Sequence, residues 1–224
     1  MAINETLFKE ITNELAEKKV QLVAVSKVQS TTDIKRMYDL GQRDFGENYV
    51  QELVEKNAAL PAEIRWHFIG HLQSNKVKHI ASFVYLIHGV DSLKLLLEIN
   101  KQGEKIGKKI NCLLQVHIAQ EETKFGLDEK ELDEILSALN TVPDRFSHVF
   151  VKGFMGMASL SDDLEKVRGE MSYLKLLLEK YKHLSAPSCQ LSILSMGMSG
   201  DYKIAIEEGS NMVRIGSLIF GERN

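Results

Sequence analysis

Short apolar runs alternate with amphipathic segments along the whole chain. Several runs are apolar at successive positions, which is typical of strands covered on both faces. Between the runs, apolar residues recur at i, i+3 and i+4, the spacing of one helix face, most clearly across 161–181. Eight runs have the composition of strands, and they cover residues 21–26, 43–46, 65–70, 83–90, 110–118, 148–157, 190–197 and 211–217.

The helical segments carry recognisable start and stop residues. Ser30 or Thr31 can cap a helix that stops at Gly41, and Asp201 opens one that stops at Gly209. Because strands and helices alternate in this way, we expect a parallel sheet with helices packed on it.

The count of eight strands favours a closed (β/α)₈ barrel of the TIM type, an α/β fold, over an open doubly wound sheet. An open sheet usually carries a glycine fingerprint after its first strand, whereas the first run here ends in Ser26-Lys27-Val28. No Pro- or Gly-rich linker interrupts the alternation, so we expect one domain over residues 1–224.

Composition narrows the function classes. The chain has 224 residues and a net charge of −3 with no dense basic run, which argues against nucleic acid as a partner. No run reaches the roughly 20 apolar residues of a membrane span, and the N-terminus lacks an apolar signal region. The two cysteines, Cys112 and Cys189, are far apart and match no metal-ligand spacing. We therefore expect a cytoplasmic protein in a reducing setting.

Lys27 is the first candidate for chemistry. It ends the run LVAVSK, where a buried strand meets a loop. Active sites of barrel enzymes lie at the carboxyl ends of the strands, where partial burial can lower the pKa of a lysine and leave an amine that attacks aldehydes. A surface lysine in a strand-to-helix loop is the alternative interpretation.

Two loops of small residues follow the seventh and eighth strands, where barrel enzymes often bind phosphate. In Gly197-Met198-Ser199-Gly200-Asp201, backbone N–H groups and the Ser199 hydroxyl suit an anion, although a plain helix cap by Ser199 or Asp201 has the same pattern. In the second loop, Arg214 is flanked by apolar residues, and Gly216 and Ser217 add donors. Arg214 needs an acceptor or anionic partner when buried, and a structural salt bridge is the alternative.

The second strand and the third supply further candidates. Asn48 and Glu47 can hydrogen-bond a ring substituent of a ligand. His67 is a candidate for lining the mouth of the barrel. His67 and His71 are four residues apart but span the end of a strand, so they do not form a helical zinc pair. His88 and His117 have the character of interior barrel residues, so no metal site is expected.

Four segments together resemble one known family. VAVSK, FGENYVQEL, WHFIGHLQSNK and LSMGMSGDYKIAIEEGSNMVRIGSLIFG are similar to the pyridoxal phosphate homeostasis proteins, single-domain relatives of the N-terminal barrel of alanine racemase. The resemblance runs from about residue 3 to residue 223 and is nearly free of gaps.

The resemblance implies roles for individual residues. Lys27 would hold pyridoxal 5′-phosphate (PLP) as a Schiff base. Ser199, the Gly200 amide, Gly216 and Ser217 would hold its phosphate, and Arg214 would face the pyridine nitrogen, as in alanine racemase.

The resemblance also implies a function without turnover: binding PLP and buffering or delivering it, with PLP-dependent apoenzymes as partners. Alanine racemase has a second, β-rich domain that lends a catalytic tyrosine across a dimer, whereas this chain stops after the eighth strand. We therefore expect a monomer that lacks the second catalytic base. Two enzyme alternatives stay open, namely a racemase-like or lyase-like enzyme acting on amino acids at Lys27, and an aldolase using Lys27 on a phosphosugar.

Overall fold

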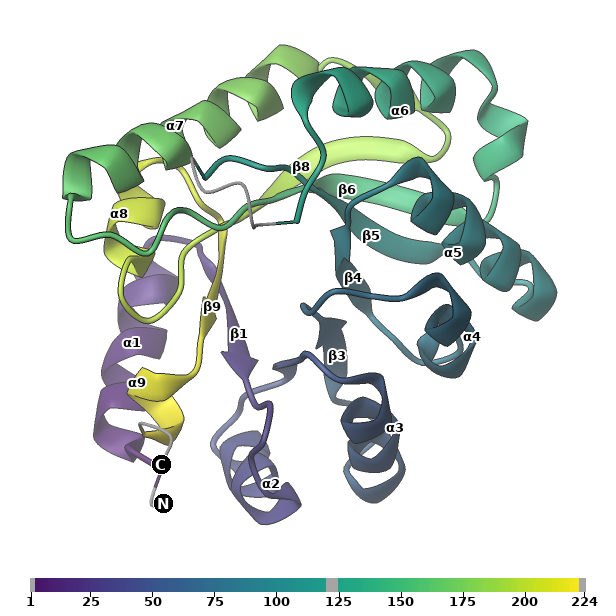
Figure 1. Cartoon of the computed structure of the whole chain (residues 1–224). Coiled ribbons are helices and arrows are strands. Elements are labelled where there is room, and N and C mark those ends of the chain that lie inside the picture. Colours follow the sequence, from purple (N-terminus) through teal and green to yellow (C-terminus); the bar gives the residue numbers. More distant parts are fainter. Residues whose placement is uncertain (1–2, 120–124, 222–224) are drawn as a thin grey trace.

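The computed structural model describes residues 3–119 and 125–221, in which eight parallel strands close into a barrel surrounded by helices (Figure 1). Neighbouring strands follow the order β6-β5-β4-β3-β2-β1-β9-β8, and pairing of β6 with β8 closes the ring. This closure confirms the predicted barrel and excludes the open sheet. The barrel strands are β1 (Gln21–Val25), β2 (Asp44–Glu47), β3 (Arg65–Phe68), β4 (Leu86–Val90), β5 (Ile110–Gln115), β6 (Val149–Met155), β8 (Cys189–Ser195) and β9 (Met212–Ile215).

One short strand was not expected from the sequence. β7 (Ser185–Ala186) pairs antiparallel with the start of β8. Two residues are too few to show the alternation by which a strand is recognised. Several predicted runs are also longer than the strands themselves. The run 83–90, for example, becomes a strand only from Leu86.

The helices lie where the amphipathic segments predict them. Ser30 rather than Thr31 caps α2, since its Oγ accepts a hydrogen bond from the N–H of Asp33 at 3.1 Å. Asp201 precedes α8 as predicted, although its side chain accepts from the N–H of Met198 and not from the helix. The helices are α1 (Glu5–Glu17), α2 (Thr31–Asp39), α3 (Val50–Ala59), α4 (Val77–Ile80), α5 (Leu93–Ile106), α6 (Glu129–Thr141), α7 (Leu164–Tyr181), α8 (Tyr202–Glu207) and α9 (Ser217–Phe220), with 3₁₀ turns η1 (Ser74–Lys76) and η2 (Pro143–Phe146).

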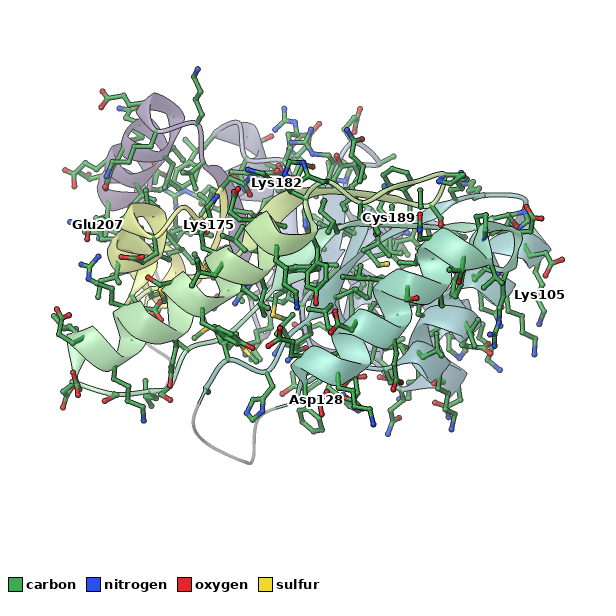
Figure 2. All side chains as sticks on the ribbon, turned by 90° about the horizontal axis from the view of Figure 1, so that it is seen from above. Lys105, Asp128, Lys175, Lys182, Cys189 and Glu207 are labelled. Carbon is green, nitrogen blue, oxygen red and sulfur yellow. The ribbon has the colours of Figure 1, made fainter. Side chains whose placement is uncertain are left out.

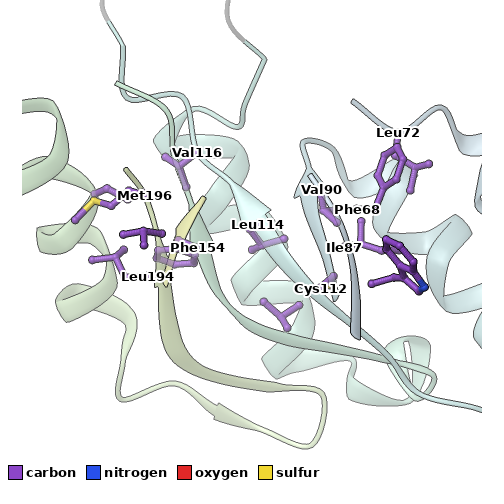
Figure 3. Packing of buried hydrophobic residues seen from close by; sticks show 14 of the residues in the cluster. Phe68, Leu72, Ile87, Val90, Cys112, Leu114, Val116, Phe154, Leu194 and Met196 are labelled. Atoms are coloured by element: carbon purple, nitrogen blue, oxygen red, sulfur yellow. The ribbon is translucent and has the colours of Figure 1, made fainter. Parts of the chain in front are cut away.

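The main core lies between the barrel and its helices. Alternate strand residues point outward into it, and Figure 3 shows part of this layer, with Cys112 and Leu114 of β5, Phe154 of β6 and Leu194 of β8. Seen from above, α6 and α7 run side by side along one flank (Figure 2), where Lys180 of α7 forms an ion pair with Glu129 of α6 at 2.7 Å. Among the described residues, no helix is long and apolar enough to cross a membrane.

The inside of the barrel holds a smaller apolar cluster. It consists of the inward-facing residues Val23, Leu86, Leu113, Met155 and Met212. Much of the remaining interior is polar. Buried polar groups need hydrogen-bond partners, so a polar interior requires an extended set of contacts. The polar residues of the interior therefore bear directly on the site.

Candidate functional site

A cavity of about 460 Å³ opens at the carboxyl ends of the barrel strands. Its volume lies in the range typical of small-molecule sites, about 300–1,000 Å³. Seven of the eight residues predicted to contact a ligand line it, and the structure brings them together from the ends of four strands, β1, β2, β8 and β9. Its lining residues are Val25, Lys27, Asn48, Ile69, Met157, Met198, Ser199, Gly200, Arg214, Gly216 and Ser217.

Four lining residues were not singled out from the sequence. Val25 and Ile69 end or follow β1 and β3, whereas Met157 and Met198 lie in the loops after β6 and β8. Their positions were predictable, because each lies near the carboxyl end of a barrel strand. Apolar side chains at these positions give the cavity walls that can pack against a flat ring.

Lys27 lies two residues after the end of β1 and is half-buried at the cavity. The next residue, Val28, has a φ of 66°, in the left-handed region that β-branched residues rarely adopt. Its N–H donates to Oε1 of Glu52 on α3 at 2.5 Å. This bond holds the backbone of the loop that presents Lys27.

A buried ion-pair network lies behind that loop. Nζ of Lys56 donates to Oε1 of Glu47 at 2.8 Å, to Oε1 of Glu52 at 2.6 Å and to the carbonyl oxygen of Ser26 at 2.7 Å. Burial raises the pKa of the Glu47 carboxyl, against the lowering effect of Lys56. Glu47 is fully buried and absent from the cavity wall, so the expectation that it contacts a ligand is wrong. The pleat of β2 turns it toward α3.

The two small-residue loops meet at the cavity. The N–H of Gly216 donates to Oγ of Ser199 at 3.3 Å. Within the part of the chain that the structure describes, the N–H groups of Ser199, Gly200 and Ser217 have no acceptor. A Cβ on Gly216 would lie 3.2 Å from both Cβ and the carbonyl oxygen of Val25, so glycine lets this loop pack closely on β1. Clustered N–H and hydroxyl donors of this kind suit an anion.

Arg214 projects into the barrel from β9 and reaches the cavity. NH1 donates to the carbonyl oxygen and to Oγ of Ser195, both at 2.8 Å, and NH2 donates to the carbonyl oxygen of Gly156 at 3.0 Å. These contacts use three of the five guanidinium N–H bonds. Burial lowers the pKa of Arg214 to about 10, with Asp201 acting in the opposite direction, so it remains a cation at neutral pH. Its partners are neutral oxygens, and the salt-bridge alternative is wrong for the described residues.

Asn48 supplies an unpaired acceptor at the cavity. Its Oδ1 is buried and lacks a donor among the described residues. An acceptor buried without a partner costs about 1–3 kcal/mol. A ligand hydroxyl or N–H at this position would remove that cost, so the atom fits a polar ring substituent.

The histidines are arranged differently from the expectation. His67 is fully buried and bonded through Nδ1 to Nε2 of His88 at 2.9 Å, so it does not line the mouth. His88 is an interior residue, as expected. His71 pairs instead with Asp91, at 3.0 Å. The described residues contain no group of three or more side chains suited to a metal ion.

Comparison with known proteins first defines the class. The family model of the alanine racemase N-terminal domain matches residues 8–224, nearly the whole chain. The fold and the position of the site at the carboxyl ends of the strands agree with that match. The molecule is therefore a barrel of the alanine racemase N-terminal-domain class.

Relatives of higher identity define the family more narrowly. A pyridoxal phosphate homeostasis protein of Pasteurella multocida is 38% identical over 211 residues, which cover 93% of this chain and 88% of that protein. One from Helicobacter pylori is 40% identical over 205 residues, covering 91% and 88%. This chain belongs to the pyridoxal phosphate homeostasis protein family.

Solved structures support the same family assignment. PipY of Synechococcus elongatus without PLP is 32% identical and superposes with a TM-score of 0.89, covering 96% of this chain and 99% of PipY. PipY with PLP bound gives a TM-score of 0.81 at 32% identity, covering 92% and 100%.

Proposed function

We propose that this protein binds PLP in the cavity at the end of β1, through a Schiff base on Lys27, and serves PLP homeostasis. The observation that carries the proposal is that three kinds of group line one cavity of about 460 Å³. They are the amine of Lys27, a cluster of hydrogen-bond donors that suit an anion, and the buried guanidinium of Arg214. A relative of the same fold, PipY, has been solved with PLP bound, and the relatives are named for PLP homeostasis.

The phosphate end of PLP fits the meeting point of the two small-residue loops. Ser199 offers a hydroxyl, and Gly216 keeps the loop close to β1. Gly200 and Ser217 offer N–H groups that have no acceptor among the described residues. Hydrogen bonds to a charged group each stabilise by roughly 1.5–3 kcal/mol. The phosphate therefore anchors the ligand even before Lys27 reacts.

The ring end fits Asn48 and Arg214. Asn48 would contact a polar ring substituent, which satisfies its buried amide. Arg214 would donate to the pyridine nitrogen, because a guanidinium has no lone pair with which to accept. The nitrogen must then be the acceptor and stays unprotonated.

That arrangement suits storage better than turnover. PLP supplies an electron sink for carbanions when its ring nitrogen is protonated, and enzymes that need the sink usually place a carboxylate there. Arg214 stands at that position, held by the neutral oxygens of Ser195 and Gly156. Alanine racemase turns over with such an arginine because it has two bases, whereas Lys27 is the one base among the described residues that line this cavity. We therefore propose a PLP carrier or buffer and not an enzyme. It would act as a monomer in the reducing cytoplasm and deliver PLP to PLP-dependent apoenzymes.

Borohydride reduction of the PLP-loaded protein, followed by peptide mass spectrometry, tests the site. The pyridoxyl group is expected on Lys27, and Lys27→Ala should lose the visible absorption band of the bound cofactor. Lys35→Ala is the matched control, because Lys35 is exposed and its one ion pair among the described residues is with Asp39 on the same helix. Label on another lysine would show that the assignment is wrong.

Turnover distinguishes the carrier from the enzyme alternative. Loaded protein mixed with alanine, serine or other amino acids should give no racemisation, transamination or elimination above that of free PLP. Robust turnover that disappears in Lys27→Ala would instead establish an amino-acid enzyme of the racemase or lyase type.

A further inference from the structure

An unbroken chain of hydrogen bonds crosses the barrel interior and ends at Arg214. Oδ1 of Asp44 lies 2.9 Å from Nε2 of His67, and Nδ1 of His67 lies 2.9 Å from Nε2 of His88. Nδ1 of His88 lies 3.1 Å from Oγ of Ser195, which accepts from NH1 of Arg214 at 2.8 Å. We call these five residues the interior relay.

The relay is isolated from solvent and built on rigid elements. Its members lie on β2, β3, β4, β8 and β9, and none is more than 5% exposed. Only Arg214 lines the cavity. At the opposite end, Asp44 pairs with Arg65, whose side chain is 45% exposed. The relay thus joins the cavity to the amino-terminal face of the barrel.

Donor and acceptor rules give the relay a single direction. The pKa of Asp44 is lowered by hydrogen bonds from Arg65 and His67 that outweigh its burial, so it is a carboxylate and only accepts. Nε2 of His67 must therefore carry the proton, which leaves Nδ1 of a neutral ring as an acceptor. His88 then donates from Nε2 and accepts at Nδ1. The hydroxyl of Ser195 donates to His88, so its oxygen is available to Arg214.

Both histidines are neutral in this arrangement. Burial lowers the pKa of His67, against the raising effect of Asp44, and Arg65 also lowers it. Burial lowers the pKa of His88 well below the usual range. A proton on His67 would lower it further, and the Arg214 cation acts in the same direction.

The ring contacts complete the surroundings of the pair. The ring of Tyr85 lies 5.4 Å from that of His67, and the two imidazoles meet edge to face at 5.2 Å. No further charged group contacts either ring in the described residues. All four ring nitrogens form their hydrogen bonds within the relay.

We infer that Asp44, His67, His88 and Ser195 are positioning residues that hold Arg214 as a hydrogen-bond donor aimed at the cofactor ring nitrogen, given the PLP site proposed above. The relay fixes one edge of the guanidinium, through Ser195, and leaves its remaining N–H bonds for the cavity. A break at His88 would free the Ser195 hydroxyl to rotate and loosen Arg214, without touching any residue of the cavity wall.

The first test needs no cofactor. Nitrogen-15 NMR of the cofactor-free protein reports which nitrogen of each histidine carries the proton. Both His67 and His88 should be neutral and protonated at Nε2 at pH 7, and His88 should remain so at pH 5.5. Protonation of either ring at Nδ1 at pH 7 would overturn the relay, whatever the protein binds.

The second test compares His88→Leu with His88→Gln. Glutamine can accept from Ser195 with its oxygen and donate to His67 with its nitrogen, whereas leucine of similar size can do neither. His88→Leu should raise the PLP dissociation constant about tenfold, roughly 1.4 kcal/mol, and shift the absorption maximum of bound PLP. His88→Gln should stay within about threefold of the wild type with an unshifted spectrum.

Ser195→Ala removes one hydroxyl and serves if His88→Leu fails to fold. It should shift the spectrum of bound PLP in the same direction as His88→Leu. Equal spectra and affinities for wild type, Ser195→Ala and a folded His88→Leu would overturn the positioning role. A wild type that binds no PLP would instead refute the proposed function, and the NMR result would still decide whether the relay exists.

Discussion

Replacement of Lys56 by methionine should cost a large share of the stability of the fold. Lys56 is 5% exposed, and its ammonium neutralises Glu47, which is fully buried. Methionine keeps the apolar stem and removes the charge, leaving Glu47 without its counter-ion. Removing one partner of a buried ion pair costs about 3–5 kcal/mol. At roughly 2–4 °C per kcal/mol for a chain of this size, Lys56→Met should melt about 10 °C below the wild type.

The loss should depend on pH. Burial already raises the pKa of Glu47 in the folded protein, and loss of Lys56 would raise it further. Above the ordinary carboxyl pKa of about 4.3, the folded state then binds more protons than the unfolded state, so stability falls as pH rises. Lowering the pH from 8 to 5.5 should therefore restore part of the stability of Lys56→Met.

Urea unfolding at pH 8 and 5.5 measures both effects. Glu47→Gln/Lys56→Met should be more stable than Lys56→Met alone at pH 8, because the buried carboxylate that lost its counter-ion is then removed. Lys35→Met, at an exposed pair, should change stability by less than 1 kcal/mol. A Lys56→Met loss below 1 kcal/mol, or one equal at the two pH values, would refute the reasoning.

Three further outcomes are expected. Ser199→Ala should weaken PLP about tenfold in a binding titration but leave pyridoxal affinity nearly unchanged, and equal losses for both ligands would remove Ser199 from the phosphate site. Gly153→Ala should unfold at a markedly lower urea concentration than the wild type. The φ of Gly153 is 152°, and the new Cβ would lie 1.9 Å from the carbonyl oxygen of Ile193. An unfolding midpoint equal to that of the wild type would contradict the close packing of β6 on β8. Arg214→Glu should shift the absorption spectrum of bound PLP. An unchanged spectrum would show that Arg214 does not contact the ring nitrogen.

The barrel could be predicted from the sequence because its signal is local. Most strands are short apolar runs, and helix punctuation such as Ser30 and Gly41 marks segments between them. β7 was not predicted because its two residues, Ser185 and Ala186, are too few to show the alternation of apolar and polar positions. Closure depended on counting to eight, since it pairs the first strand, β1, with the last, β9, whose residues are about 190 positions apart.

The cavity residues could be predicted for a related reason. Lys27, Asn48 and Ser199 each follow a strand, and parallel strands of a barrel end on the same face. The interior relay was not predictable in this way. His67 and His88 become neighbours only when β3 pairs with β4, so their pairing has no local pattern in the sequence. Lys56, four residues after Glu52, has the spacing of an ordinary exposed helix pair, and burial alone distinguishes it.

The left-handed backbone at Val28 has an evolutionary consequence. A valine at a φ of 66° costs about 1–2 kcal/mol relative to a residue that adopts this region readily, such as glycine or asparagine. A library randomised at position 28 and selected for heat tolerance should therefore drift toward glycine. Selection for cofactor retention need not follow, because glycine would also free the loop that presents Lys27. At position 28, selection for heat tolerance and selection for cofactor retention would therefore favour different residues.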